Sequence, residues 1–182
     1  LYDTAIQNHQ KRNFQIAKNL YKEILKIDSN HFESIYLLGT VYLQTKKINE
    51  AKQMFTKSIR IRPNDVEVNN NLGITFNKLG EYEKAISCYK KIIKIQPGYA
   101  YAYNNCGNTL KAMKEFEKAI IYYKKAIEIK PNYIAAHKNL MQIYEKTNKE
   151  KELREAILQA RTLIKGDPII NLYEGILLYR NE

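Results

Sequence analysis

The sequence predicts an all-α solenoid made of antiparallel helix pairs that stack side by side. The main observation is a glycine that recurs at every thirty-fourth position, at Gly39, Gly73 and Gly107, and that returns at Gly175. A period of this length is typical of one helix-pair unit stacked on copies of itself. The hydrophobic content of 45% is enough for a packed interior. We therefore expect a repeat array with an extended surface suited to binding.

Counting from Gly107 with this period divides the chain into repeats of one array that covers residues 1–182. Proline recurs with the same step at Pro63, Pro97 and Pro131 and cannot continue a helix, so it separates each repeat from the next. Both ends of the sequence fall inside a repeat, which we expect to reflect cuts from a longer chain. The complete repeats are 32–65, 66–99, 100–133 and 134–167, and the partial ones are 1–31 and 168–182.

Each repeat contains two apolar stripes at helical spacing, which predict two helices. A stripe with steps of three and four residues marks the buried face of a helix. In repeat 66–99 a turn at Gly80 separates the two stripes. The stripes of the three regular repeats contain Leu38, Gly39, Tyr42, Ile48, Ala51, Phe55 and Ile59, then Leu72, Gly73, Phe76, Tyr82, Ala85, Tyr89 and Ile92, then Tyr103, Cys106, Gly107, Leu110, Phe116, Ala119 and Tyr123.

The small and aromatic residues have predicted packing roles. Gly73 and Ala85 are expected where the two helices of one repeat cross closely, because a larger side chain would separate them. The rings of Tyr89 and Tyr123 are expected to fill the space between adjacent helix pairs.

Repeat 134–167 departs from this pattern. The small residues of the regular repeats are replaced by larger ones, and the ring and the proline are lost. We expect the same helix pair with a looser or shifted second helix. The substituted positions are Met141, Leu153, Ile157 and Lys165.

These residues at these spacings resemble the tetratricopeptide repeat. The resemblance covers the whole chain and is strongest over residues 32–133. It implies a right-handed superhelix in which the first helix of each repeat lines a concave groove. It also implies that the groove binds a protein or an extended peptide.

Asparagine recurs on the predicted inner face of the groove. Asn71, Asn105 and Asn139 occupy the same place in three successive repeats. Because an amide offers both a donor and an acceptor, such a ladder could hold a peptide backbone without reading its side chains. This resembles the asparagine ladder of the O-linked N-acetylglucosamine transferases. The alternative is that an asparagine-rich composition simply fills solvated positions. The candidate peptide-binding residues are Tyr36, Asn70, Asn71, Lys78, Tyr101, Asn104, Asn105, Asn108, Lys111 and Asn139.

No catalytic constellation is found in the sequence. His9, His31 and His137 are dispersed, and no two of them have metal-ligand spacing. The seven glycines form no phosphate-binding loop. We therefore predict a protein that is not an enzyme and that uses no cofactor or metal.

The composition suggests a cytoplasmic protein. Two cysteines, Cys88 and Cys106, are too few for a disulfide framework. The sequence contains no N-glycosylation sequon, no signal peptide and no apolar stretch as long as a membrane span. The formal charge of +11 arises from lysines spread along the chain rather than from one basic run.

Three alternatives remain open beside the peptide-binding scaffold. Residues 172–180 resemble repeats that precede sulfotransferase domains in bacterial proteins, so the array could be the recognition or oligomerisation arm of a protein-modifying transferase of the sulfotransferase or glycosyltransferase type. An exposed solenoid end could associate with another copy of the chain. A basic surface could bind RNA or another anionic partner through Lys90, Lys94, Lys111, Lys124 and Lys125, and binding would then weaken with salt.

Overall fold

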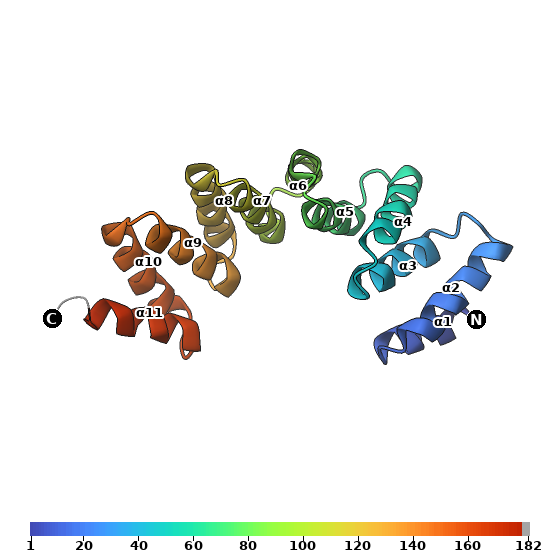
Figure 1. Ribbon diagram of the computed structural model, residues 1–182, viewed down its shortest axis with the longest axis horizontal. Coiled ribbons are helices and arrows are strands. Elements are labelled where there is room, and N and C mark those ends of the chain that lie inside the picture. Colours follow the sequence, from blue (N-terminus) through green and yellow to red (C-terminus); the bar gives the residue numbers. More distant parts are fainter. Residues whose placement is uncertain (180–182) are drawn as a thin grey trace. The chain divides into compact units, whose positions relative to one another are not determined.

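The structure, a computed structural model, describes residues 1–179, without the side chains of Glu174 and of residues 176–179. Residues 1–179 form eleven α-helices and no strand. Successive helices form hairpins (Figure 1). The predicted all-α solenoid of helix pairs is confirmed.

The chain divides into two compact bodies, which are described separately. The N-terminal body covers Leu1–Ile95, and the C-terminal body begins at Gln96. The helices of the N-terminal body are α1 (Tyr2–Gln10), α2 (Phe14–Ile27), α3 (Phe32–Gln44), α4 (Ile48–Ile61), α5 (Val66–Lys78) and α6 (Tyr82–Ile95). Those of the C-terminal body are α7 (Ala100–Ala112), α8 (Phe116–Ile129), α9 (Ile134–Lys146), α10 (Glu150–Leu163) and α11 (Pro168–Tyr179).

The helix starts follow the period of the sequence. The odd-numbered helices α3 to α11 begin at residues 32, 66, 100, 134 and 168. The even-numbered helices α2 to α10 begin at residues 14, 48, 82, 116 and 150. We call the odd-numbered helices first helices and the even-numbered ones second helices.

A glycine on the first helix of each regular repeat is required by an aromatic ring on the second helix. A Cβ atom built on Gly73 would lie 2.6 Å from Cε1 of Tyr89, which is too close for any side chain. Each ring therefore packs against the glycine of its own helix pair. The sequence had led us to expect the rings of Tyr89 and Tyr123 in the space between adjacent pairs instead. The same relationship joins Gly39 to Phe55 and Gly107 to Tyr123.

The turn between the two helices of a pair contains one residue in the left-handed region. Gly80 adopts it at a φ of 74° without steric strain. The same turn position in the other four pairs carries a side chain, at Arg12, Lys46, Lys114 and Asn148, with φ between 54° and 63°. The turns at Arg12, Lys46 and Lys114 therefore hold backbone strain that Gly80 avoids, whereas asparagine adopts this region more readily.

The degenerate repeat keeps its helix pair. Met141 and Ile157, which replace the glycine and the ring, are both buried. Without the glycine–ring contact, α10 lies less closely against α9 than α8 lies against α7. The predicted loosening of the second helix is thus observed.

Candidate functional site

One face of α7 carries most of the predicted site residues of the C-terminal body. Tyr101, Asn104, Asn108 and Lys111 follow one another at three- and four-residue steps, so they share one side of the helix. Tyr101 is 45% exposed, whereas Asn104 is only 4% exposed. Asn104 therefore contributes through its neighbours rather than by direct contact with a guest.

A hydrogen-bonded network connects this face of α7 to α9. The Nδ2 atom of Asn139 donates to Oδ1 of Asn104 at 3.1 Å. The ammonium group of Lys111 donates to Oδ1 of Asn139 at 2.9 Å and to Oε1 of Gln142 at 3.3 Å. The network fixes the orientation of each amide and of the ammonium group before any guest arrives.

Lys111 lies in a partly desolvated position. Burial lowers the pKa of its ammonium group from the usual value, and the nearby charge of Lys146 lowers it further. A hydrogen bond from an ammonium group in such a place is stronger than one formed in bulk water. Lys111 can therefore act as a donor to a carbonyl or carboxylate oxygen.

Asn108 and Asn105 are half-buried on the same helix. The Oδ1 atom of Asn108 accepts a hydrogen bond from the hydroxyl of Tyr123 at 2.8 Å, which ties the surface amide to the core ring. Asn105 also interacts within the chain. These amides are held in place by the fold.

A tyrosine cluster in which Tyr101 is exposed and Tyr99 and Tyr133 are half-buried lies beside the network. The ring centroid of Tyr101 is 5.0 Å from that of Tyr133 and 5.6 Å from that of Tyr99. The ammonium group of Lys130 lies 3.1 Å from the hydroxyl of Tyr101 and 5.0 Å from the centre of its ring. Of these three tyrosines, only Tyr101 was predicted as a site residue. Tyr99 and Tyr133 are one repeat apart, each just before a first helix, and this recurrence was the signal that could have revealed them.

In the N-terminal body the predicted site residues lie on α3 and α5. The Nδ2 atom of Asn71 donates to the hydroxyl of Tyr36 at 3.0 Å. Burial raises the pKa of Tyr36 to about 12, so its hydroxyl stays protonated. Asn70 is half-buried and interacts within the chain, whereas Lys78 is exposed.

A hollow of about 460 Å³ opens between α1, α2 and α3, and the sequence did not predict it. His9 borders it and joins two helices, with Nε2 2.9 Å from Oε1 of Gln44 and Nδ1 3.4 Å from the hydroxyl of Tyr21. The mixture of rings, aliphatic groups and amides suits an apolar side chain with a polar end. The lining residues are Ile6, His9, Gln10, Arg12, Phe14, Tyr21, Leu37 and Gln44.

Two asparagines of the predicted ladder form hydrogen bonds between neighbouring first helices. Asn71 belongs to the N-terminal body, and Asn105 and Asn139 belong to the C-terminal body. Asn71 and Asn139 each join two first helices by a hydrogen bond. An amide has two N–H groups and two oxygen lone pairs, so Asn139, with its second bond from Lys111, still has one N–H group and one lone pair for a guest. Contact between these amides and a peptide stays a prediction.

Membrane-spanning helices and metal-binding clusters are both absent from the described residues 1–179. None of the helices within residues 1–179 has both the length and the apolar character needed to cross a membrane. Over the same residues no group of three or more His, Cys, Asp or Glu side chains is arranged to hold a metal ion.

The stacked helix pairs and the polar faces of their first helices define a helical-repeat protein. The chain belongs to the tetratricopeptide repeat family, because two models of that family match residues 9–72 and 65–132. The resemblance inferred from the glycine, ring and proline spacing is thus confirmed.

Solved structures of MamA are similar to this chain. A crystal structure of MamA is 29% identical, covers 86% of this chain and 91% of its own, and has a TM-score of 0.80. A second MamA structure is 28% identical, with 88% of each chain covered and a TM-score of 0.80. MamA from Desulfovibrio magneticus RS-1 (residue 41 to the end) is 21% identical over 88% of this chain and 91% of its own, with a TM-score of 0.81, and shows the fold alone. Comparison with curated protein sequences gave no match.

Proposed function

We propose that the chain is a non-catalytic scaffold that binds an extended segment of another protein on the faces of its first helices. One observation carries this proposal. In the C-terminal body the exposed ring of Tyr101, supported by its half-buried neighbour Tyr133, adjoins a network of oriented amides and an ammonium group on α7 and α9. Rigid rings beside fixed hydrogen-bonding groups favour peptide binding, because little conformational freedom is lost on association.

The two kinds of group would contact different parts of the guest. The remaining N–H and C=O positions of Asn108 and Asn139 suit the backbone of an extended peptide. The ring of Tyr101 offers apolar area to a guest side chain. In the N-terminal body, the hollow beside His9 offers a separate place for an apolar side chain.

The test begins with peptides selected from a random display library against the full chain and titrated by calorimetry. Tyr101→Ala should weaken binding by about 2 kcal/mol, or about thirtyfold in Kd, which is typical of a central aromatic contact. Lys111→Ala should weaken it as well. The controls Ile121→Ala and Lys22→Ala remove exposed side chains from second helices and should leave Kd unchanged. Equal affinity for all four variants would refute the proposed surface.

A further inference from the structure

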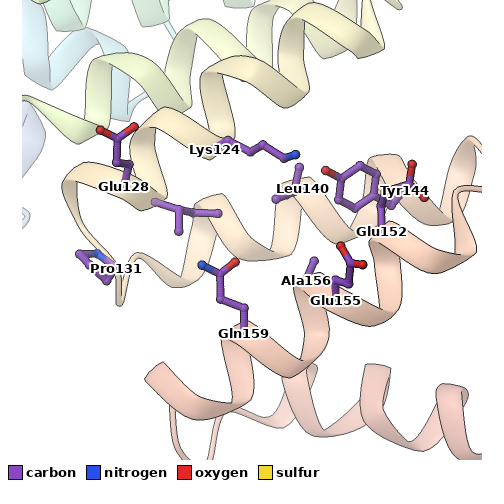
Figure 2. A pocket seen from close by; sticks show the side chains of 10 residues that line it. Lys124, Glu128, Pro131, Leu140, Tyr144, Glu152, Glu155, Ala156 and Gln159 are labelled. Atoms are coloured by element: carbon purple, nitrogen blue, oxygen red, sulfur yellow. The ribbon is translucent and has the colours of Figure 1, made fainter.

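A groove between two second helices of the C-terminal body has features of a second binding surface. It lies between the second helices α8 and α10, with α9 as its floor, and encloses about 430 Å³. We call it the α8–α10 groove. Figure 2 shows Leu140 and Tyr144 of α9 between a wall from α8 and a wall from α10. Its apolar lining comes from Leu140 and Tyr144 on the floor, from Ile127 of α8 and Ala156 of α10 on the walls, and from Pro131.

The hollow coincides with a substitution in the degenerate repeat. Ala156 stands one repeat after Tyr122, so a methyl group replaces a ring at the same position of the second helix. Tyr122 is half-buried in its own repeat and packs against Tyr103, with ring centroids 6.3 Å apart. Ala156 therefore occupies less of the groove than a tyrosine at this position would.

The walls of the groove are acidic, although the chain as a whole carries a net charge of +11. Glu128, Glu152 and Glu155 line it together with one cation, Lys124. One repeat earlier, the equivalent positions hold Lys94, Lys118 and Ile121, and none of these residues is acidic.

These carboxylates are accessible to a partner. All three glutamates are exposed. Glu128 is paired with Lys125 at 2.6 Å, but this pair lies at the surface and contributes little that a partner could not replace. Glu155 forms no ion pair with any residue in the described part of the chain. Glu152 interacts with the nearby charge of Lys149, so Glu155 is the carboxylate of the three that is most available for recognition.

We propose that the α8–α10 groove binds a basic amphipathic peptide segment, with a bulky apolar side chain in the hollow and lysine or arginine side chains against Glu128, Glu152 and Glu155. The apolar floor accounts for the hydrophobic part of the guest, and the carboxylates account for its positive charge. An acidic peptide or a nucleic acid would be repelled by the same carboxylates. None of its lining residues belongs to the Tyr101–Asn139 surface of α7 and α9, so it is a second site beyond the proposed function.

The probe is a fluorescein-labelled synthetic peptide with leucine and lysine on opposite faces of a helix, measured by fluorescence anisotropy with the full chain. A version with glutamate in place of lysine should not bind. The double variant Glu152→Lys/Glu155→Lys should weaken binding of the lysine peptide about tenfold or more. The double variant Glu23→Lys/Glu83→Lys makes the same change in net charge at exposed positions outside the groove and should bind like the parent chain.

A second variant tests the hollow itself without changing any charge. Ala156→Tyr restores the ring that Tyr122 supplies one repeat earlier, so it should fill the space and abolish binding. Thermal unfolding followed by circular dichroism establishes that the variant is folded. If Ala156→Tyr does not fold, the two charge variants still decide the matter. The inference is overturned if the lysine peptide fails to bind the parent chain at low salt, or if the groove and control double variants bind it equally.

Discussion

The hydrogen bond between Asn139 and Asn104 occupies the same repeat position as the hydrogen bond between Asn71 and Tyr36. The donor Asn139 stands two repeats after the donor Asn71, and the acceptor Asn104 stands two repeats after the acceptor Tyr36. In both bodies the bond connects neighbouring first helices. The recurring asparagine therefore holds adjacent repeats together and fixes the surface that a guest would meet.

Removal of the Asn139 side chain should destabilise the C-terminal body. Asn139→Ala leaves the amide of Asn104, which is 4% exposed, without its bridging partner. We expect a loss of about 1–3 kcal/mol in the free energy of unfolding, measured by urea denaturation. Asn132→Ala, at an exposed turn position, is the control and should change the free energy by less than about 0.5 kcal/mol. Equal losses would show that the bridge contributes nothing.

The glycine–ring contact predicts a steric effect at Gly107. A Cβ atom there would lie 2.7 Å from Cε1 of Tyr123, so Gly107→Ala must move the ring or separate α7 from α8. Overpacking of this kind costs about 1–3 kcal/mol, which chemical denaturation can measure. Gly98→Ala adds the same methyl group where no atom lies within 4 Å and should be nearly neutral. A neutral Gly107→Ala would contradict the packing described here.

The strained turns predict a gain in stability. Lys114 has a φ of 63°, which is costly for a residue with a Cβ atom. Lys114→Gly should raise the free energy of unfolding by about 0.5–1 kcal/mol. The reciprocal change, Gly80→Ala at the same turn position, should lower it by about 1 kcal/mol. Melting temperatures that move in the opposite directions would rule out strain at this position.

His137 predicts a dependence of stability on pH. Its side chain is 1% exposed, Nε2 donates to the carbonyl of Pro131 at 2.8 Å, and Nδ1 has no hydrogen-bond partner among the described residues. Desolvation lowers the pKa of His137 below its ordinary value of 6.5, although the bond to Pro131 opposes part of the shift. The folded chain therefore holds the neutral ring at pH values where the unfolded chain is protonated. The free energy of unfolding should fall as the pH decreases below about 6.5.

The control for His137 is suggested by the equivalent residue two repeats earlier. Asn69 occupies the equivalent position, and its Nδ2 donates to the carbonyl of Pro63 at 3.1 Å. His137→Asn should keep the corresponding bond to Pro131 and lose the titration. The difference in stability between the parent chain and His137→Asn should shrink as the pH falls from 7.5 to 5. A constant difference would exclude His137 as the titrating group.

The fold class and the helix pairs were predictable from the sequence, because they depend on patterns within one repeat. The period of Gly73, Tyr89 and Pro97 was sufficient for the fold class and for the helix pairs, because each of these residues acts within one repeat. The substitutions at Met141 and Ile157 correctly indicated a looser pair.

Features formed by residues far apart in the chain were not predictable in the same way. The tyrosine cluster needs Tyr101 and Tyr133 to meet, and the N-terminal hollow needs His9 to reach Gln44, which lies in the next repeat. The partners of the surface amides were also missed. Asn104 was expected on the inner face, but its amide is buried and accepts a hydrogen bond from Asn139. Its burial depends on how α9 packs against α7, and a pattern within one repeat does not show this packing.

The side-chain amide signals of the asparagines test the central claim most directly. In a nitrogen–proton NMR correlation spectrum of the full chain, saturation with a display-selected peptide should shift the NH₂ signals of Asn108 and Asn139. The signals of the exposed residues Asn49 and Asn132, which lie outside the first-helix faces, should not move. Shifts confined to Asn49, Asn132 or the second helices, with Asn108 and Asn139 unchanged, would contradict peptide binding on the first-helix faces.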